Sequence, residues 1–271
     1  MVITTAATHG ANSGIRANPE VTVSAPSRLE WQVATVVQLR DETRRARTLV
    51  LDVPQWPGHR AGQHVDVRLV AEDGYQAQRS YSVASPPEDA TLALTVERLD
   101  DGEVSPYLCG ILGVGDGVEV RGPIGGYFVW DITQGGPLLL VAGGSGIVPL
   151  MAMLRHYAHA DALARERVPV RLLYSARTWD DVIYREELKR LADSTGVRVT
   201  FTLTRDAPTE WSSYRRRIDR AMLDAVSWPA DEMPRAFVCG PTPLVESVAT
   251  LLVELGHDAA RVRTERFGPT G

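Results

Sequence analysis

The chain has 271 residues, of which 44% are hydrophobic, and its formal net charge is −5. This length allows one large domain or two of ordinary size, and the negative charge argues against nucleic acid as the main ligand. No membrane span is expected, because the most apolar stretch, residues 137–154, is interrupted by several glycines and by Pro149.

The cysteines and the N-terminal composition narrow the class of protein further. Cys109 and Cys239 are far apart, so they form neither a metal-ligand spacing nor a disulfide framework, and we expect no metal site. The four-cysteine spacing of a plant-type iron–sulfur domain is also missing. Residues 1–28 are rich in small and polar residues and lack the apolar run of a signal peptide. We therefore predict a disordered tail over residues 1–28 and a cytoplasmic protein.

The chain after this tail first shows the pattern of short β-strands. Apolar and polar residues alternate, or Gly and Pro bound an apolar run, in six segments: residues 31–39, 48–53, 64–69, 78–83, 91–98 and 117–121. Six short strands separated by such turns predict a closed antiparallel β-barrel, which we assign to residues 29–132. A short helix over residues 104–112 is expected before the last strand, with Pro106 in its first turn.

After Thr133 the pattern changes to an alternation of strands and helices. The predicted strands are residues 138–142, 170–175, 197–204, 235–239 and 262–267, and the predicted helices are residues 149–160, 180–192, 218–226 and 242–255. Such alternation predicts right-handed βαβ units around a five-stranded parallel sheet. The sequence thus predicts two domains, an N-terminal six-stranded antiparallel β-barrel and a C-terminal α/β domain over residues 137–271.

The fourth predicted strand carries a motif with chemical potential, residues 79–82 (RSYS). At a period of two, Arg79 and Tyr81 point to one face of a strand and Ser82 to the other. A site for a diphosphate and a flat heterocycle needs a cation, a ring to pack on the heterocycle and a hydroxyl at its edge. An ordinary barrel strand with a surface Arg and a core Tyr explains these residues equally well.

Two glycine motifs precede predicted helices. In residues 102–105 (GEVS), a glycine allows a phosphate to approach and a helix start favours anions, but a plain turn with Ser105 as N-cap is the simpler interpretation. Residues 143–149 (GGSGIVP) follow an apolar strand and open a helix, which is the context of a dinucleotide-binding loop. The loop ends in Pro149 rather than in Gly, yet it still predicts a diphosphate at a helix N-terminus.

The carboxyl ends of the predicted parallel strands carry further candidates. Ligands of open α/β sheets bind at these ends, which favours a site role for Cys239 in the segment CGP at 239–241. Cys109 is better explained as a small buried hydrophobe. Arg177 and Arg205 follow the second and third strands, and residues 215–217 are three further arginines. Arginine can hold a 2′-phosphate bidentately, although a solvated basic loop explains the first two of the three.

Taken in order, the motifs RSYS, GEVS, GPIGGYF (residues 122–128), GGSGIVP and CGP resemble those of the ferredoxin–NADP reductase superfamily. The resemblance covers residues 31–267 and implies a flavin barrel followed by a nicotinamide-nucleotide domain. It implies an FAD-dependent enzyme that transfers a hydride from NADPH or NADH to FAD. It also implies that FAD is bound by Arg79, Ser80, Tyr81, Ser82, Val96, Arg98, Gly102, Val104 and Ser105.

The same resemblance implies roles for residues of the second domain. It places the nucleotide against Gly144, Ser145, Gly146, Cys239 and Gly240, and a 2′-phosphate against Arg177, Arg205 and Arg217, so that NADP(H) is favoured over NAD(H). Ser82 and Cys239 would lie beside the reacting rings as catalytic residues. Glu265 could help with proton transfer, although a surface salt bridge is the interpretation that the sequence favours. Phe267 is the nearest candidate for the aromatic residue with which many members cover the flavin.

The resemblance leaves the electron acceptor open. Because no iron–sulfur domain is recognisable, it implies a separate ferredoxin, another one-electron carrier or an oxygenase component. Four arginines near the first predicted hairpin, Arg40, Arg44, Arg45 and Arg47, would suit an acidic partner, but a solvated hairpin explains them equally well. Two other functions also stay open, a diaphorase or flavin reductase for quinones, free flavin or oxygen, and a nucleotide-binding regulatory module without turnover.

Overall fold

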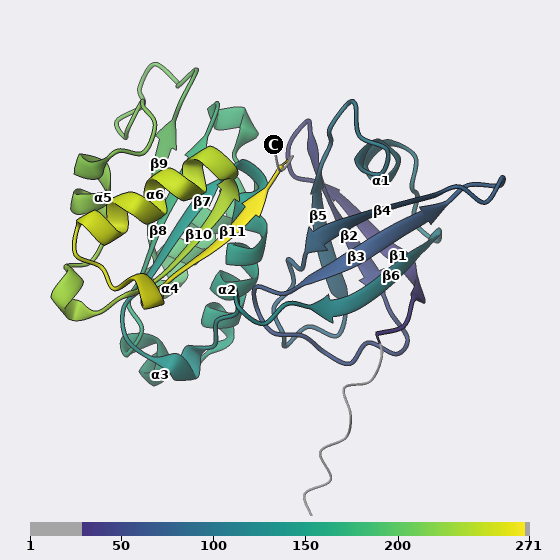
Figure 1. Cartoon of the computed structure of the whole chain (residues 1–271), viewed down its shortest axis with the longest axis horizontal. Coiled ribbons are helices and arrows are strands. Elements are labelled where there is room, and N and C mark those ends of the chain that lie inside the picture. The colour runs from purple at the N-terminus through teal and green to yellow at the C-terminus, as the bar shows by residue number, and fades with distance from the viewer. Residues whose placement is uncertain (1–28, 269–271) are drawn as a thin grey trace, which may run out of the picture.

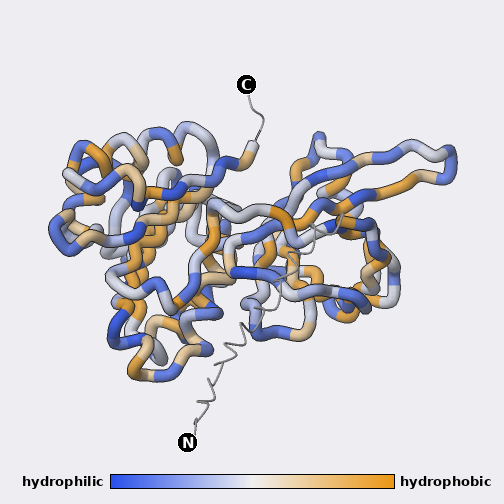
Figure 2. The backbone as a smooth tube through the Cα atoms, turned by 60° about the horizontal axis from the view of Figure 1, so that its bottom comes forward, coloured by the Kyte–Doolittle hydropathy of each residue, from blue (hydrophilic) through white to orange (hydrophobic). Residues whose placement is uncertain are grey.

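The computed structural model describes residues 29–268, and the tail predicted at residues 1–28 lies outside the described residues. The described chain contains two sheets that lie side by side (Figure 1). In Figure 2, hydrophobic and hydrophilic segments alternate along the tube in both halves. We refer to the N-terminal sheet with its helix as the barrel and to the rest as the α/β half.

The barrel confirms the predicted six antiparallel strands, which are ordered β4-β3-β6-β1-β2-β5. An isolated bridge between Val83 and Leu94 joins the ends of the two outer strands, β4 and β5, and so closes the sheet on itself. A short helix, α1, connects β5 to β6 as expected. The elements are β1 (Gln32–Asp41), β2 (Ala46–Asp52), β3 (His64–Val70), β4 (Gln76–Ser82), β5 (Leu92–Glu97), α1 (Ser105–Gly110) and β6 (Gly117–Ile124).

The α/β half confirms the predicted five-stranded parallel sheet, ordered β11-β10-β7-β8-β9. Its strands are β7 (Leu138–Gly143), β8 (Val170–Ala176), β9 (Arg198–Leu203), β10 (Arg235–Pro241) and β11 (Val262–Phe267). Its helices are α2 (Ile147–His159), α3 (Ala162–Glu166), α4 (Arg185–Thr195), α5 (Arg220–Val226) and α6 (Thr242–Glu254). Short 3₁₀ turns occupy residues 132–134, 144–146, 179–181, 230–232 and 259–261.

Alternate residues of the central strand β7 explain how the helices cover both faces of this sheet. Leu140 packs in a cluster with residues of α2 and α4, whereas its neighbours Leu139 and Val141 pack with residues of α5 and α6. A fully buried parallel strand reads as a continuous apolar run for this reason. The cluster on the α2 side also includes Ala84 and Ala93 of the barrel, so the two halves share one hydrophobic core.

The sequence prediction differs from the structure at several helices. Helix α3 was not predicted. Helix α4 begins at Arg185 rather than at residue 180, because a capping box between Thr178 and Asp181 closes a separate 3₁₀ turn before it. Helix α5 begins at Arg220, where the side chain of Asp219 accepts a hydrogen bond from the Met222 N–H as N-cap.

The helices of the described region are short. The longest of them, α2 and α6, have 13 residues each. Within residues 29–268, no helix combines the length and the apolar character that crossing a membrane requires.

The shared core generates a stability prediction. Leu140 is 0% exposed at the centre of the parallel sheet, so Leu140→Ala should lower the free energy of unfolding by about 2–5 kcal/mol. Leu163→Ala is the matched control, because that side chain is 70% exposed and its loss should change the stability by less than about 0.5 kcal/mol. Urea denaturation followed by circular dichroism measures both, and equal losses would contradict this assignment of the core.

Candidate functional site

The predicted site residues gather where the carboxyl ends of the parallel strands face the barrel. Strand β11 points its carboxyl end toward the barrel (Figure 1). On that strand, Glu265 Oε1 lies 4.0 Å from Nδ1 of His64 on β3. On the loop that follows β7, a Cβ atom at Gly144 would lie 4.0 Å from Oε2 of Glu97 on β5. The motifs of the two halves therefore meet at one junction.

Arg79 is held by one carboxylate and one backbone carbonyl of the chain itself. Its guanidinium donates to Glu103 Oε2 at 3.0 Å and to the carbonyl of Gln78 at 2.7 Å. Glu103 also accepts a hydrogen bond of 2.5 Å from the Tyr75 hydroxyl, and this bond is the main cause that lowers the pKa of Glu103. Arg79 is half exposed, so a diphosphate could replace Glu103 as its anionic partner.

The other residues of the RSYS motif divide between the two faces of β4. Tyr81 is half-buried against the barrel core, and burial raises the pKa of its hydroxyl. Ser80 lies on the opposite face, where its hydroxyl donates to Asp66 Oδ1 at 2.7 Å. Asp66 is also paired with Arg121 at 2.6 Å. The Ser80 hydroxyl thus donates within the barrel, while its exposed oxygen can still accept a hydrogen bond.

Ser82 provides the test of whether this site fits the implied cofactor. Its hydroxyl is buried and has no hydrogen-bond partner among the described residues. A buried hydroxyl without a partner is unfavourable, and such exceptions call for an explanation. The edge of a flavin ring carries nitrogen and oxygen atoms that would satisfy this hydroxyl. The residues at this position therefore fit the cofactor that the sequence implies.

The GEVS segment at residues 102–105 differs from its simpler interpretation as a capped turn. The N-cap of α1 is Val104, and the Ser105 hydroxyl instead accepts a hydrogen bond of 3.0 Å from the Leu99 N–H. A Cβ atom at Gly102 would lie 3.0 Å from that hydroxyl. The prediction of Ser105 as a side-chain N-cap is therefore wrong, because its hydroxyl fixes the preceding loop.

Two more predicted flavin contacts, Val96 and Arg98, have mostly structural partners. Val96 is buried in the barrel core, and its carbonyl accepts a hydrogen bond of 3.5 Å from the Cys109 thiol. The Arg98 backbone N–H donates to the Arg45 carbonyl at 2.7 Å, and its side chain pairs with Asp100 at 3.2 Å. Both residues therefore anchor the strand β5 and the loop after it.

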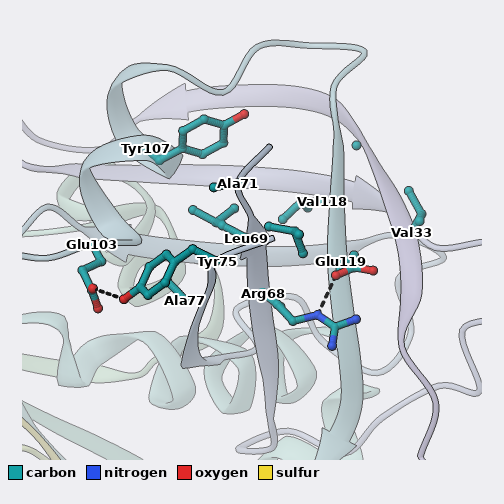
Figure 3. A pocket seen from close by; sticks show the side chains of 12 residues that line it. Val33, Arg68, Leu69, Ala71, Tyr75, Ala77, Glu103, Tyr107, Val118 and Glu119 are labelled. Carbon is teal, nitrogen blue, oxygen red and sulfur yellow. Dashed lines mark hydrogen bonds and ion pairs between the residues drawn. The ribbon is translucent and has the colours of Figure 1, made fainter. Parts of the chain in front are cut away.

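A pocket of about 650 Å³ opens on the barrel near this loop. Figure 3 shows apolar side chains such as Leu69 and Val118 lining it, with the Tyr75–Glu103 hydrogen bond at one end. The Arg68–Glu119 ion pair lies at the other end. The pocket therefore adjoins the partner of Arg79, whereas Ser82, Cys239 and Glu265 are not among its lining residues.

The nucleotide loop of the α/β half is packed directly on the end of β10. A Cβ atom at Gly146 would lie 2.2 Å from the carbonyl oxygen of Cys239. Gly240 has φ +153°, and a Cβ atom there would lie 3.0 Å from the backbone of Gly143. Only glycine fits these two positions, so both motifs are needed to bring β7 and β10 together. Ser145, the residue before Gly146, is half-buried.

Cys239 and Glu265 form the centre of the junction. The Cys239 sulfur lies 3.9 Å from Glu265 Oε2, and the thiol is fully buried. Burial is the main cause that raises the pKa of Cys239 well above its usual value, and Glu265 adds to it. Burial also raises the pKa of Glu265 to about 7 and lowers that of His64. Both partners of the His64–Glu265 contact thus favour their neutral forms, so we interpret it as a polar contact rather than a strong ion pair.

Two of the predicted phosphate-binding arginines, Arg177 and Arg205, lie together at the ends of β8 and β9. The Arg205 N–H donates to the Arg177 carbonyl at 2.9 Å, which places the two residues side by side. Tyr214 forms an isolated parallel β-bridge with Thr202, so residues 214–217 lie beside the end of β9. Within residues 29–268, no carboxylate lies within ion-pair distance of Arg177, Arg205 or Arg217.

The two neighbouring arginines confirm the simpler interpretation that the sequence favours for them. Arg215 donates to three carbonyls of its own loop, those of Pro208, Thr209 and Trp211. Arg216 pairs with Asp219 at 2.5 Å. Both side chains therefore stabilise the loop.

The structure also shows the surroundings of Phe267 and of the basic hairpin. Phe267 ends β11 beside Pro241 and packs against the core shared by the two halves. In the basic hairpin, Arg47 pairs with Asp41 at 2.6 Å and Arg45 with Asp100 at 3.3 Å. The hairpin therefore carries less unpaired positive charge than its sequence suggests.

Sequence reasoning missed His64 at this junction. His64 opens an alternating strand segment that gives no chemical signal by itself. In the antiparallel register, however, His64 lies directly opposite Ser82. The pairing of these two neighbouring strands is the signal that would have identified it.

The raised pKa of Glu265 predicts how stability depends on pH. A carboxyl group whose pKa is raised on folding stabilises the protein below its unfolded pKa, and this contribution is lost as the pH rises through about 7. Glu265→Gln should therefore gain stability relative to wild type between pH 5 and 8, by up to about 3 kcal/mol. Urea denaturation across this range measures the difference. Glu210→Gln, an exposed control, should show no such trend, and a pH-independent difference for Glu265→Gln would contradict the assignment.

Comparisons with known proteins agree with the two-part architecture. Residues 32–129 match the oxidoreductase FAD-binding domain family, and residues 140–250 match the oxidoreductase NAD-binding domain family. The chain is 32% identical to the glycine betaine monooxygenase reductase subunit of Chromohalobacter salexigens, over 86% of this chain and 63% of that protein. It is 35% identical to ferredoxin–NADP reductase B of Sorangium cellulosum, over 76% of this chain and 84% of that protein.

A solved structure extends the likeness to the fold. The cytochrome P450 reductase from Amycolatopsis superposes with a TM-score of 0.74 at 28% identity, over 90% of this chain and 71% of that one. The chain spans about 63% of the length of the glycine betaine monooxygenase reductase subunits that it matches. The order of the two domains, their motifs and this similarity over most of its length show that the chain belongs to the ferredoxin–NADP reductase superfamily of FAD- and NAD(P)-dependent oxidoreductases.

Proposed function

We propose that this chain is an FAD-dependent NAD(P)H reductase that passes electrons to a separate one-electron acceptor, either a ferredoxin or an oxygenase component. The observation that carries the proposal is the unpaired buried hydroxyl of Ser82, which lies opposite His64 and so faces the junction with Glu265 and Cys239. The acceptor class is supported by the similar reductase subunit of a glycine betaine monooxygenase and by the similar ferredoxin–NADP reductase.

In this proposal the barrel holds FAD and residues 29–132 act as its domain. Arg79 pairs with the diphosphate, and the backbone at Gly102, Val104 and Ser105 approaches it where α1 begins. Tyr81 offers a ring for packing, and the Ser82 hydroxyl bonds the edge of the flavin. The remaining predicted contacts, Ser80, Val96 and Arg98, contribute backbone. When bound, FAD supplies a ring that accepts a hydride from a reduced nicotinamide and releases electrons singly.

Residues 137–271 form the nucleotide domain in this proposal. Gly144, Ser145 and Gly146 receive the diphosphate of the nucleotide at the start of α2. The end of β10 at Cys239 and Gly240 supports the nicotinamide, and Phe267 covers the flavin side. The buried Cys239 thiol stays protonated, because burial raises its pKa, and so adds no charge to the junction.

Glu265 and His64 handle protons at this junction in the proposed mechanism. The pKa of Glu265 is about 7, so it can hold or give up a proton at neutral pH. His64 is about a quarter exposed and lies 4.0 Å from Glu265, which is itself about a fifth exposed, so both groups can exchange protons with solvent. With FAD bound in the barrel, Glu265 and His64 would hold or exchange protons with solvent beside its ring.

We further propose NADPH as the preferred donor and a reducing compartment, such as the cytoplasm, as the location. Arg177, Arg205 and Arg217 support the first point, because a 2′-phosphate would provide the anion that they lack among the described residues. Two free cysteines support the second, since Cys109 and Cys239 form no disulfide in the described chain.

The decisive experiment is the visible spectrum of the protein as purified and after addition of FAD. Flavin absorbance that bleaches under anaerobic NADPH or NADH is expected, and a protein that stays colourless after FAD addition would overturn the proposal. Turnover with a ferredoxin is then compared with turnover with free flavin and quinones. A much higher rate with the small acceptors would support a flavin reductase or diaphorase instead.

The Arg79–Glu103 ion pair predicts two opposite changes in FAD affinity. Arg79→Ala removes the cation for the diphosphate, so the dissociation constant for FAD should rise by about tenfold or more. Glu103→Gln removes the internal competitor, so the constant should fall by about twofold to fivefold. Quenching of flavin fluorescence during titration of the apoprotein measures both. Asp73→Asn, on the turn between β3 and β4, is a control and should leave the constant unchanged. A weaker affinity in Glu103→Gln would show that Glu103 supports binding instead.

The three exposed arginines predict the nucleotide preference. The triple variant in which Arg177, Arg205 and Arg217 become Ala should lower kcat/KM for NADPH by about tenfold or more and leave kcat/KM for NADH within about twofold. Replacing Arg215 and Arg216 by Ala provides a matched control, because these side chains bind their own loop. An equal loss with both nucleotides would show that the three arginines do not recognise a 2′-phosphate.

A further inference from the structure

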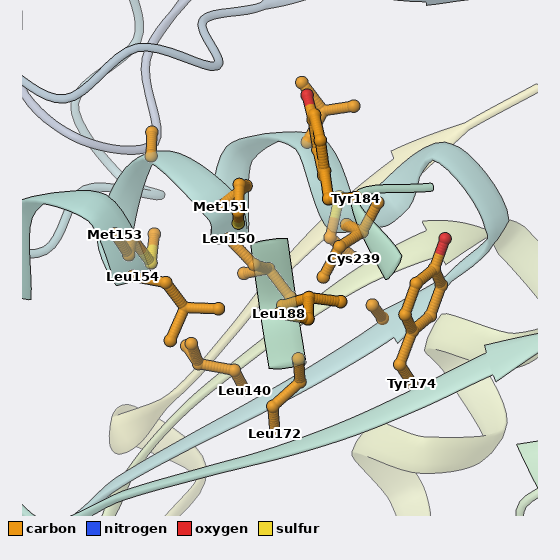
Figure 4. Close-up of a cluster of buried hydrophobic side chains, with 14 of the residues drawn as sticks. Leu140, Leu150, Met151, Met153, Leu154, Leu172, Tyr174, Tyr184, Leu188 and Cys239 are labelled. Carbon is orange, nitrogen blue, oxygen red and sulfur yellow. The ribbon is translucent and has the colours of Figure 1, made fainter. Parts of the chain in front are cut away.

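Tyr184 has a backbone conformation that its neighbours must stabilise. It immediately precedes α4 with φ 60° and ψ 25°, in the left-handed region, where bulky residues are rare. Its side chain is only 2% exposed. Figure 4 shows the ring standing next to the buried side chains of the α/β half, with its hydroxyl directed away from Leu140 and Leu172 of the sheet. Strain of this kind persists only where the surroundings fix it, and it often marks a functional position.

The Tyr184 hydroxyl starts a chain of hydrogen bonds that crosses into the barrel. It donates to Thr95 Oγ1 on β5. The Thr95 hydroxyl is hydrogen-bonded to that of Thr48 on β2 at 2.7 Å, and Thr48 in turn donates to Glu42 Oε1 at 2.7 Å. Thr48 and Thr95 are both buried, and burial raises the pKa of Glu42. Buried polar groups arranged in this way require one relative position of the two halves.

Arg155 makes a second crossing at the same place. From α2 it donates to the carbonyl of Ala84 in the barrel at 2.7 Å. It also pairs with both carboxylate oxygens of Glu187 on α4, at 2.8 and 2.7 Å. Its guanidinium lies 4.9 Å from the centre of the Tyr184 ring. A bidentate arginine that is also hydrogen-bonded to a carbonyl has little freedom, so α2, α4 and the barrel are fixed to one another.

The ends of this network lie next to the residues that hold the two ring systems. Ala84 follows Ser82 by two positions, and Thr95 precedes Val96 on β5. On the other side, Arg155 belongs to α2, the helix that begins directly after the nucleotide loop at residues 143–146. The network therefore connects the flavin strand of the barrel to the nucleotide loop by short and rigid segments.

We propose that Tyr184, Thr95 and Arg155 are positioning residues that set the distance and angle between the flavin site and the nicotinamide site. The proposal rests on the proposed hydride transfer, whose rate depends steeply on the alignment of donor and acceptor. None of the three side chains needs to touch the nucleotide or the flavin for this role.

The test compares hydroxyl-deleting variants with a conservative one. In Thr95→Val and Tyr184→Phe, the rate of flavin bleaching at saturating nucleotide should fall by about tenfold or more, with NADP⁺ affinity unchanged within about twofold. With 4-deuterated nucleotide, the isotope effect should rise, because hydride transfer becomes fully rate-limiting. Thr95→Ser keeps the hydroxyl and should restore the wild-type rate. Stopped-flow spectroscopy and equilibrium titration measure these quantities.

A second readout does not depend on turnover. Hydrogen–deuterium exchange of the purified holoprotein should be faster in residues 92–97 and 184–188 of both variants, with no change in β7. Tyr157→Phe is the matched control, since its hydroxyl donates to the Arg165 carbonyl at 3.4 Å within the α/β half. It should behave as wild type in every measurement.

Three outcomes would overturn the positioning role. They are wild-type bleaching rates in Thr95→Val and Tyr184→Phe, a Thr95→Ser variant as slow as Thr95→Val, or unchanged exchange at the two interface segments. A wild-type protein that neither nucleotide bleaches would instead overturn the proposed function, and the exchange data would still decide whether the network fixes the two halves.

Discussion

Strand β5 has no face open to solvent, and the architecture of the junction depends on this constraint. Leu92, Leu94 and Val96 point into the barrel core, whereas Ala93 packs in the core of the α/β half. Thr95 shares the outward face with Ala93, so its hydroxyl is buried between the two halves and must find partners there. A single strand thus belongs to two hydrophobic cores, which is why the barrel and the parallel sheet cannot be displaced independently.

The chain itself supplies partners for most polar groups of the site assembled around this strand. Arg79 has Glu103, Ser80 has Asp66, and Ser105 has the Leu99 backbone. Ser82 is different, since its buried hydroxyl is left without a partner among the described residues. In the proposed complex, Arg79 would exchange Glu103 for another partner, whereas Ser82 would gain its first partner.

The sequence predicts the strands well, because hydrophobic patterning is a local property. The alternation in residues 64–69 and the apolar run in residues 138–142 each correspond to a strand. Helix α4 starts later than predicted because the 3₁₀ turn capped by Thr178 and Asp181 precedes it, and the left-handed Tyr184 just before the helix has its hydroxyl bonded to a residue 89 positions away in sequence. Contacts of this kind are properties of the packed structure.

The same reasoning explains the charged residues that sequence analysis could not assign. The basic hairpin reads as a run of cations, but Arg45 meets Asp100 only because β2 and β5 pair. Arg215 and Arg217 are near neighbours in sequence, and only the folded loop shows that the first is bound to three carbonyls. Which arginine is available to a ligand is therefore decided by tertiary structure, whereas the presence of arginine is decided by sequence.

The self-pairing of Arg79 has a consequence for the effect of ionic strength on the cofactor. Salt screens an exposed ion pair, so a cation that is free before binding loses affinity for a phosphate as the salt concentration rises. In the proposed complex the diphosphate would replace Glu103, and salt would weaken the pair that is broken as well as the pair that is formed. The two effects would oppose each other, so Arg79 would act as an exchange site whose contribution to FAD binding is buffered against changes in ionic strength.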